Sequence, residues 1–173
     1  MTESARQQVI DEIERAFNGL ARGDITLHET DVIDGCGSER QRRKARKLDV
    51  EKRWQDVPAL AIDSRPTALC YAGDSFRYYL AAYMVRSLRD LTSPVVDFTI
   101  YALMPNTNKP RHKWKLERYS EFSPEQTQAV FHFLQLTAEE EDYNDSAKRA
   151  LDALWAEKAE QAHSLDALED PRC

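Results

Sequence analysis

The chain has 173 residues, of which 42% are hydrophobic and 31% are charged, with a formal net charge of −6. This length suits one domain around one core, and the balance of apolar and charged residues excludes a disordered chain. With 5 glycines and 7 prolines, the composition argues against a turn-rich sandwich or barrel and favours helices. Charges run through the N-terminal stretch MTESARQQVIDEIERAF, so we expect neither a signal peptide nor a membrane span, and a cytoplasmic location.

Three helices are expected in the first third of the chain. Residues 4–20 carry apolar side chains at helical spacing, and residues 26–35 begin with Thr26 and Glu29 at the spacing of a capping box. The third helix is expected over residues 38–54, where positions 39 to 53 hold eight basic and three acidic residues and few apolar ones. Most of this third helix should therefore face solvent.

The middle of the chain is expected to hold the core. Residues 57–72 contain short apolar runs near prolines, which fit either a small β-hairpin or a packed irregular segment. Residues 74–91 place apolar side chains along one side of a helix. We expect this central helix to organise the rest of the chain.

The last third should add two more helices after a polar loop at residues 106–113. Ser123, Pro124 and Gln126 mark the clearest helix start, and a final helix should begin at Asn144 or Asp145. From residue 139 onward there are eleven acidic and four basic residues, so the acidity lies at the C-terminal end. The predicted fold is mainly α: a single helical domain of five or six helices over residues 1–165, with room for one small β-hairpin and a frayed acidic tail at 166–173.

Three stretches together resemble a known family: TLHETDVID leading to WQDVP, FRYYLAAYM in the centre, and SPEQTQAVFHFL near the end. In order and spacing they are similar to an uncharacterised bacterial family of domains of unknown function, over about residues 27–136. The family pattern has a proline after the leucine of the central motif, where this chain has Ala81. The resemblance implies a small bacterial cytoplasmic protein, and it assigns no activity and no role to any residue.

The nearest approach to a metal-ligand cluster is His28, Glu29, Asp31 and Asp34. A helix would turn His28, Asp31 and Asp34 the same way, as a divalent ion requires. Glu29 is already explained as a capping partner, and the helix dipole favours acids in the first turn. We therefore expect local capping roles and no cofactor, with a metal-dependent hydrolase-like enzyme as an alternative.

A basic surface is the second candidate site. Cations suit phosphates, and an aromatic ring among them can stack on an unpaired base. The residues concerned are Arg42, Arg43, Lys44, Arg46, Lys47 and Trp114. The acidic C-terminal segment and a sequence pI near 5.3 argue against nucleic acid. Opposite charges in one chain instead suit a protein partner, because complementary potentials steer encounter.

Arg77 and Tyr78, with Tyr79 and Tyr83, could form an anion pocket, although tyrosines at helical spacing more often pack in a core. The cysteines show no CxxC spacing, which indicates reduced thiols, and Cys36 between two glycines is either incidental or reactive. No nucleotide-binding or hydrolase motif occurs. The sequence thus predicts a non-enzymatic, cytosolic protein-binding module of regulatory, adaptor or immunity-like type, with a nucleic-acid binder through residues 39–53 as a further alternative.

Overall fold

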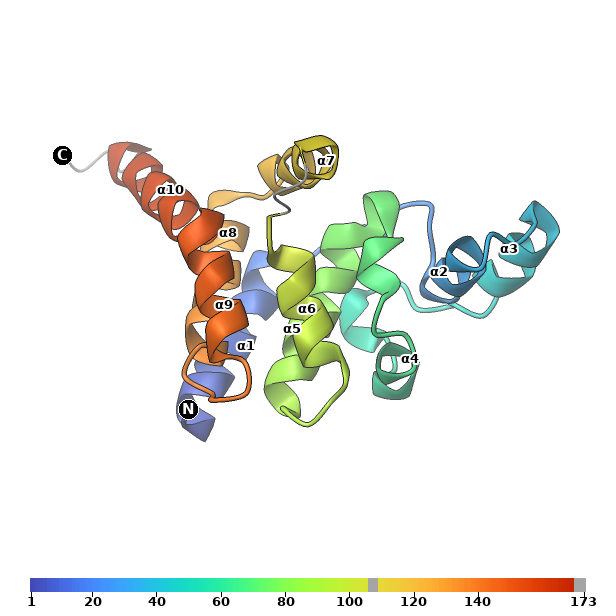
Figure 1. Ribbon diagram of the computed structural model, residues 1–173, viewed down its shortest axis with the longest axis horizontal. Helices are drawn as coiled ribbons and strands as arrows, with labels where there is room; N and C mark the ends of the chain where they lie inside the picture. The colour runs from blue at the N-terminus through green and yellow to red at the C-terminus, as the bar shows by residue number, and fades with distance from the viewer. Residues whose placement is uncertain (106–108, 170–173) are drawn as a thin grey trace. The chain divides into compact units, whose positions relative to one another are not determined.

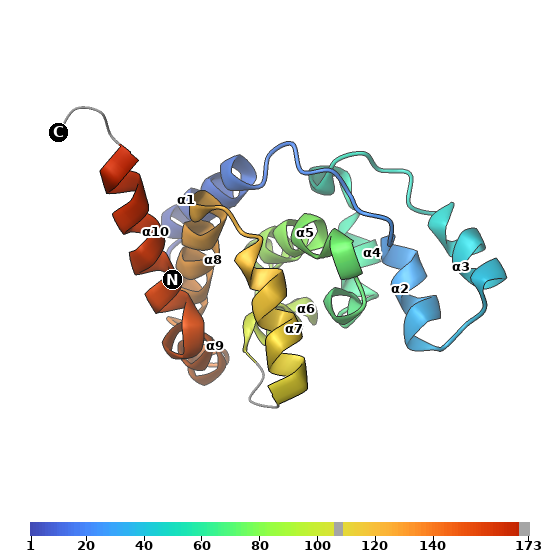
Figure 2. The ribbon, with the colours of Figure 1, turned by 90° about the horizontal axis from the view of Figure 1, so that it is seen from above.

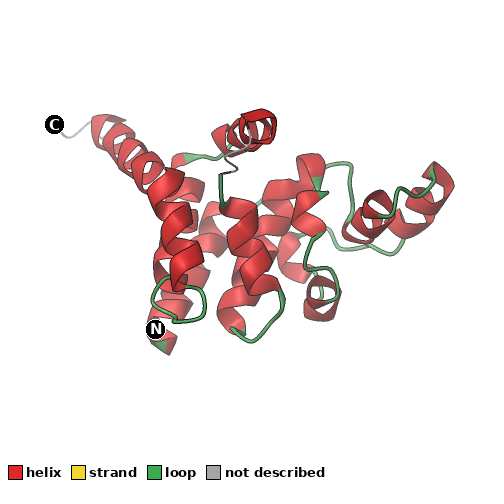
Figure 3. Ribbon diagram, in the orientation of Figure 1, coloured by secondary structure: helices red, strands yellow, loops and turns green. Residues whose placement is uncertain are grey.

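The computed structural model describes residues 1–105 and 109–169, and every regular element in these ranges is a helix (Figure 3). The mainly α prediction is therefore confirmed, while the expected five or six helices are too few, since ten α-helices lie within the described ranges. The internal contacts divide the chain into two units. Unit 1 comprises Met1–Ala16 and Leu103–Cys173, and unit 2 comprises Phe17–Ala102.

Unit 2 is built around α5, Phe76–Arg89, in which eleven of 14 residues are buried. This is the central helix that the apolar spacing predicted. The other helices of this unit are α2 (Leu27–Asp34), α3 (Glu39–Arg46), η1 (Trp54–Asp56), α4 (Ala59–Asp63), η2 (Ala68–Cys70), η3 (Gly73–Ser75) and the start of α6 (Val95–Leu103). α2 and α3 lie side by side at one end of the unit (Figures 1 and 2).

Of the two alternatives for residues 57–72, the β-hairpin is wrong, because this segment forms the short helices α4 and η2. α4 and η2 both contact α5, and Ile62, Ala68 and Leu69 are buried. The prolines that suggested strand ends instead separate these turns. Pro58 stands immediately before α4, where the missing N–H costs no helical hydrogen bond.

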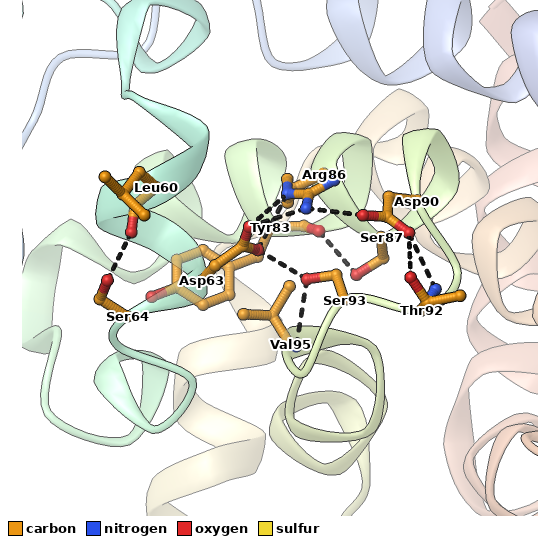
Figure 4. Close-up of polar contacts among 10 residues, drawn as sticks. All are labelled: Leu60, Asp63, Ser64, Tyr83, Arg86, Ser87, Asp90, Thr92, Ser93 and Val95. Carbon is orange, nitrogen blue, oxygen red and sulfur yellow. Dashed lines mark hydrogen bonds and ion pairs between the residues drawn. The ribbon is translucent and has the colours of Figure 1, made fainter.

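A polar network fixes the C-terminal end of α5 (Figure 4). The Arg86 guanidinium donates to both oxygens of Asp63, from Nε at 2.9 and 3.1 Å and from Nη2 at 2.7 Å, and to Asp90 at 2.8 Å. The Ser93 hydroxyl also donates to Asp63, at 2.6 Å. These bonds connect α4, the end of α5 and the turn before α6.

Unit 1 is centred on α8, Pro124–Thr137, which packs against α1 and α10. Its start is the predicted one: Gln126 N–H donates to Ser123 Oγ at 3.2 Å, and Ser123 N–H donates to Gln126 Oε1 at 3.3 Å. The remaining helices are α1 (Glu3–Ala16), α7 (Lys109–Ser120), α9 (Asn144–Ala150), the π-helical turn η4 (Leu151–Trp155) and α10 (Ala156–Glu169).

Three expected boundaries in the sequence differ from those observed. The first helix ends at Ala16, before Gly19 turns the chain with a φ of 72°. The loop expected at residues 106–113 is helical from Lys109, while 106–108 lie outside the described residues. α10 continues to Glu169, past the expected boundary at residue 165, and the last four residues of the expected tail lie outside the description.

Candidate functional site

Glu29 attaches α3 to α2. Its side chain is fully buried, and its carboxylate accepts hydrogen bonds from Arg42 Nε at 2.8 Å and from Arg46 Nη2 and Nε at 2.6 and 3.1 Å. The N–H of Thr26 donates to the same carboxylate at 3.3 Å, which completes the glutamate half of the predicted capping box. Burial alone would raise the pKa of Glu29, but the bonds from Arg46, Thr26 and Arg42 outweigh it and hold the pKa below its ordinary value.

Because Glu29 binds two of the arginines, the cations of α3 fall into two groups. Arg42 and Arg46 face α2, and Ala45 is the one buried residue of the helix. The other cations are exposed and have no bonding partner within the described part of the chain. They are Arg40, Arg43, Lys44 and Lys47. Spaced three and four apart, they lie along one outward face.

The segment directly after α3 exposes its apolar side chains and turns its acidic ones inward. Leu48 is 62% exposed and Val50 is 82% exposed. Asp49 between them is buried, and its carboxylate accepts from the backbone N–H of His28 at 2.9 Å and lies 2.6 Å from His28 Nδ1. Arg22 Nη1 donates to Glu51 at 3.2 Å and to the carbonyl oxygen of Asp49 at 3.2 Å.

These bonds explain why the predicted helix over residues 38–54 stops at Arg46. Continuing the helix would carry Asp49 and Glu51 out of reach of His28 and Arg22. The chain instead leaves the helix through a turn at residues 47–48, after which Asp49 is buried while Leu48 and Val50 on either side of it are exposed. The hydrogen bonds of Asp49 and Glu51 therefore decide how this segment is oriented, and Leu48 and Val50 face solvent.

The four acidic and histidine candidates for a metal site each have a separate partner. His28 pairs with Asp49 and Glu29 with the two arginines, while Asp31 lies 2.8 Å from Arg65 Nε and Asp34 accepts a hydrogen bond from Tyr71. No group of three or more His, Cys, Asp or Glu residues within residues 1–105 and 109–169 could hold a metal ion. The geometry therefore lends no support to the metal-dependent alternative.

Arg77 and Tyr78 do not form the anion pocket that was considered. They are consecutive on α5, so they do not face the same side of the helix. Tyr78 and Tyr79 are buried, with ring centroids 5.1 Å apart in an edge-to-face arrangement. Burial, followed by the charge of Glu51, raises the pKa of Tyr78 to about 12. This tyrosine is a core residue.

Trp114 belongs to α7 in unit 1, whereas the basic helix α3 belongs to unit 2. Its ring is 45% exposed, and the Arg118 guanidinium carbon lies 3.8 Å from the ring centroid. A cation thus already covers one face of the ring.

Comparison with protein families gives one match. Residues 5–159 match the model of a family described as a family of unknown function (DUF6714). The chain belongs to this family. DUF6714 carries no described activity, so the match assigns no residue a role. Searches of curated proteins and of solved structures found no match for the chain. Within the described residues, no helix is long and apolar enough to cross a membrane.

Sequence reasoning on this DUF6714 member missed Leu48, Val50 and Asp49, because the basic run was expected to stay helical past them. One signal was present: in LDVE, apolar and acidic residues alternate, which is the period of an extended segment. The alternation alone does not indicate whether the apolar or the acidic residues face inward. It depends on His28 and Arg22, which lie more than twenty residues earlier in the chain.

Proposed function

We propose that this DUF6714 protein is a non-enzymatic protein-binding module of regulatory, adaptor or immunity-like type. The binding site is the α3 surface, defined as the outward cations Arg40, Arg43, Lys44 and Lys47 together with Leu48 and Val50. The observation that carries the proposal is the exposure of Leu48 and Val50 on a segment whose acidic side chains turn inward. The partner is a protein that presents carboxylates around an apolar depression.

The physical argument begins with the hydrophobic effect. Fully burying a Leu or Val side chain is worth roughly 1.5–3 kcal/mol, so leaving both in water gives up stability that a partner can recover. The inward bonds of Asp49 and Glu51 hold the segment in this orientation before any partner arrives. Such pre-organisation lowers the entropy lost on binding.

The outward cations add specificity. Arg40, Arg43, Lys44 and Lys47 lie along one helical face directly before the apolar pair and have no bonding partner among the residues described. A row of cations attracts an acidic partner from a distance and disfavours basic ones. An apolar centre with a charged rim is the usual organisation of a protein interface.

A protein partner suits this surface better than nucleic acid does. Arg42 and Arg46 are already paired with Glu29, which leaves fewer unpaired cations for phosphates than the sequence suggested. Leu48 and Val50 have no role on a phosphate backbone, whereas an apolar contact at the centre of a protein interface carries much of its energy.

The test is an affinity capture from the native lysate, with and without nuclease, using three proteins. These are the wild type, a Leu48→Ser/Val50→Ser variant, and a Leu60→Ser control that replaces a leucine 78% exposed on α4. We expect one stoichiometric protein with the wild type and the control, and its loss with the double variant. Circular dichroism should show equal helix content in all three.

The captured protein then allows a sharper measurement. In surface plasmon resonance, Arg43→Glu/Lys47→Glu should slow association and weaken its dependence on salt, because steering by charge is screened by ions. Equal capture by the wild type and Leu48→Ser/Val50→Ser would overturn the proposal. Material that disappears with nuclease would favour the nucleic-acid alternative instead.

A further inference from the structure

A hollow of about 420 Å³ lies between α1 and α8, two neighbouring helices of unit 1. Gln126 Nε2, near the start of α8, donates to the carbonyl oxygen of Ala16, the last residue of α1, at 3.2 Å. Further along α8, His132 lies beside Glu12, so the two helices run in opposite directions. The residues that line the hollow recur every three or four positions, so each helix contributes one face. A volume of this size is typical of a site for a small molecule.

One end of the hollow holds an imidazole and a guanidinium group with unused donors. Both carboxylate oxygens of Glu12 lie near His132 Nδ1, at 3.0 and 2.8 Å. Because an ionised carboxylate only accepts, Nδ1 carries the proton and Nε2 is left for another partner. Arg15 stands one turn after Glu12 and donates from Nε to the carbonyl oxygen of Asp11 at 3.3 Å. Within the described part of the chain, its two Nη groups and His132 Nε2 have no hydrogen-bond partner.

The rest of the hollow differs in character from this end. Val9 and Leu136 line its middle, where Leu136 is buried and Val9 is half-buried, so both present apolar atoms. Glu139 lines the other end, roughly two helical turns beyond His132. The hollow therefore offers hydrogen-bond donors at one end, an apolar middle and a negative charge at the other end.

We propose that this hollow binds a small monocarboxylate with a short apolar chain. The carboxylate accepts hydrogen bonds from the Nη groups of Arg15, whose planar fork suits this anion. It accepts another from His132 Nε2 once the ring has taken up a second proton, and Glu12 then balances the charge of the ring.

The other lining residues select among carboxylates. The apolar chain of the ligand lies along Val9 and Leu136, and the charge of Glu139 disfavours a ligand with a second carboxylate. The site belongs to unit 1 and does not depend on the proposed function, whose surface belongs to unit 2.

The experiment is a nuclear magnetic resonance titration of the labelled full-length protein near neutral pH and at constant ionic strength. The probes are acetate, butyrate and hexanoate, with hexanamide as the neutral control and adipate as the dicarboxylate. We expect saturable binding of hexanoate, with affinity rising by up to about fourfold for each CH₂ group that is buried. The ring signals of His132, assigned by comparison with His132→Gln, should move towards their protonated positions. Hexanamide and adipate should bind about tenfold more weakly or less.

Substitutions test the two donor groups. Arg15→Gln and His132→Gln should each weaken hexanoate binding about tenfold or more, because each removes a charge-assisted hydrogen bond. Arg149→Gln is the matched control for Arg15, since Arg149 makes the same kind of bond, from Nε to the carbonyl oxygen of Asp145 at 3.4 Å, outside the hollow. His163→Gln on α10 is the control for the histidine. Both controls should bind hexanoate as the wild type does.

Three results would overturn this assignment. The first is that hexanoate gives no saturable change at the residues of the hollow, and the second is that hexanamide binds as tightly as hexanoate. The third is that Arg15→Gln keeps the wild-type affinity while circular dichroism shows an unchanged helix content. Arg15 is exposed and its substitution leaves the Glu12–His132 pair in place, so its variant tests binding apart from folding.

Discussion

Two helices of unit 2, α5 and α3, are held by the same chemistry in different surroundings. In α5, Arg86 binds Asp63 and Asp90, and in α3, Arg42 and Arg46 bind Glu29. α5 has eleven buried residues, whereas α3 has one. In α5, the ion pairs of Arg86 therefore add to packing that already fixes the helix. α3 lacks a buried apolar face, so the ion pairs of Arg42 and Arg46 with Glu29 are its main attachment to α2.

The carboxylates that accept these hydrogen bonds also differ in burial. Glu29 is fully buried, while Asp63 and Asp90 keep some exposure, 24% and 38% of their side chains. Removing one partner of a buried pair leaves an uncompensated group, and the cost grows with burial. The comparison therefore predicts that equivalent substitutions have unequal effects, with the largest at Glu29.

Glu29→Gln should give the largest effect. Breaking a buried pair costs about 3–5 kcal/mol, but Arg42 and Arg46 can turn to water, so we expect a loss of about 2–3 kcal/mol. Urea unfolding measures this change. Hydrogen exchange should also show faster exchange of the α3 amides. Glu39→Gln is the matched control, since this exposed glutamate lies 3.7 Å from Arg42. Equal stability of both variants would contradict the attachment role of Glu29.

Asp63→Asn should give a smaller loss of about 1–2 kcal/mol, because the asparagine can keep one bond to Arg86 or to Ser93. Amide exchange in the middle of α5 should stay slow, since buried apolar residues hold that helix. If α5 opened as readily in this variant as α3 does in Glu29→Gln, packing would not be what distinguishes the two helices.

The same contrast explains what the sequence could predict. α5 was predicted within two residues at each end, because its apolar spacing reports the burial that forms it. The start of α8 was predicted from Ser123, Pro124 and Gln126, since capping is a local interaction. Features that depend on local bonds or on apolar periodicity can be found in this way.

The end of α3 and the short helices within residues 57–72 could not be found in this way. α3 stops because Asp49 and Glu51 bind His28 and Arg22, and no local rule relates residues so far apart. The division of the basic run into Arg42 and Arg46 on one side and Arg43 on the other likewise depends on Glu29. The sequence therefore indicated the basic stretch that the proposed site uses, but it did not indicate the exposed Leu48 and Val50.

Acid should weaken the ion pair between Arg86 and Asp90 over a defined pH range. Hydrogen bonds from the Thr92 hydroxyl, from Arg86 and from the Thr92 N–H lower the pKa of Asp90 to about 2 from its ordinary value of 3.8. A carboxyl whose folded pKa is lowered stabilises the fold above its unfolded pKa, and this contribution is lost as pH falls from about 4 to about 2. Asp90→Asn should be less stable than the wild type at about pH 5, and the difference should shrink towards about pH 2. A difference that stays constant with pH would contradict the lowered pKa.

The smallest expected effect distinguishes two neighbouring arginines that the sequence alone treats as equivalent. Arg43 points outward without a bonding partner in the described structure, so Arg43→Ala should leave the free energy of unfolding within about 0.5 kcal/mol of the wild type. Arg42 donates to buried Glu29, and Arg42→Ala should cost about 1 kcal/mol, because Arg46 still pairs with that carboxylate. Urea unfolding of both variants measures the contrast. Partner binding should show the reverse order, with the larger loss from Arg43→Ala, because Arg43 belongs to the α3 surface and Arg42 to its attachment.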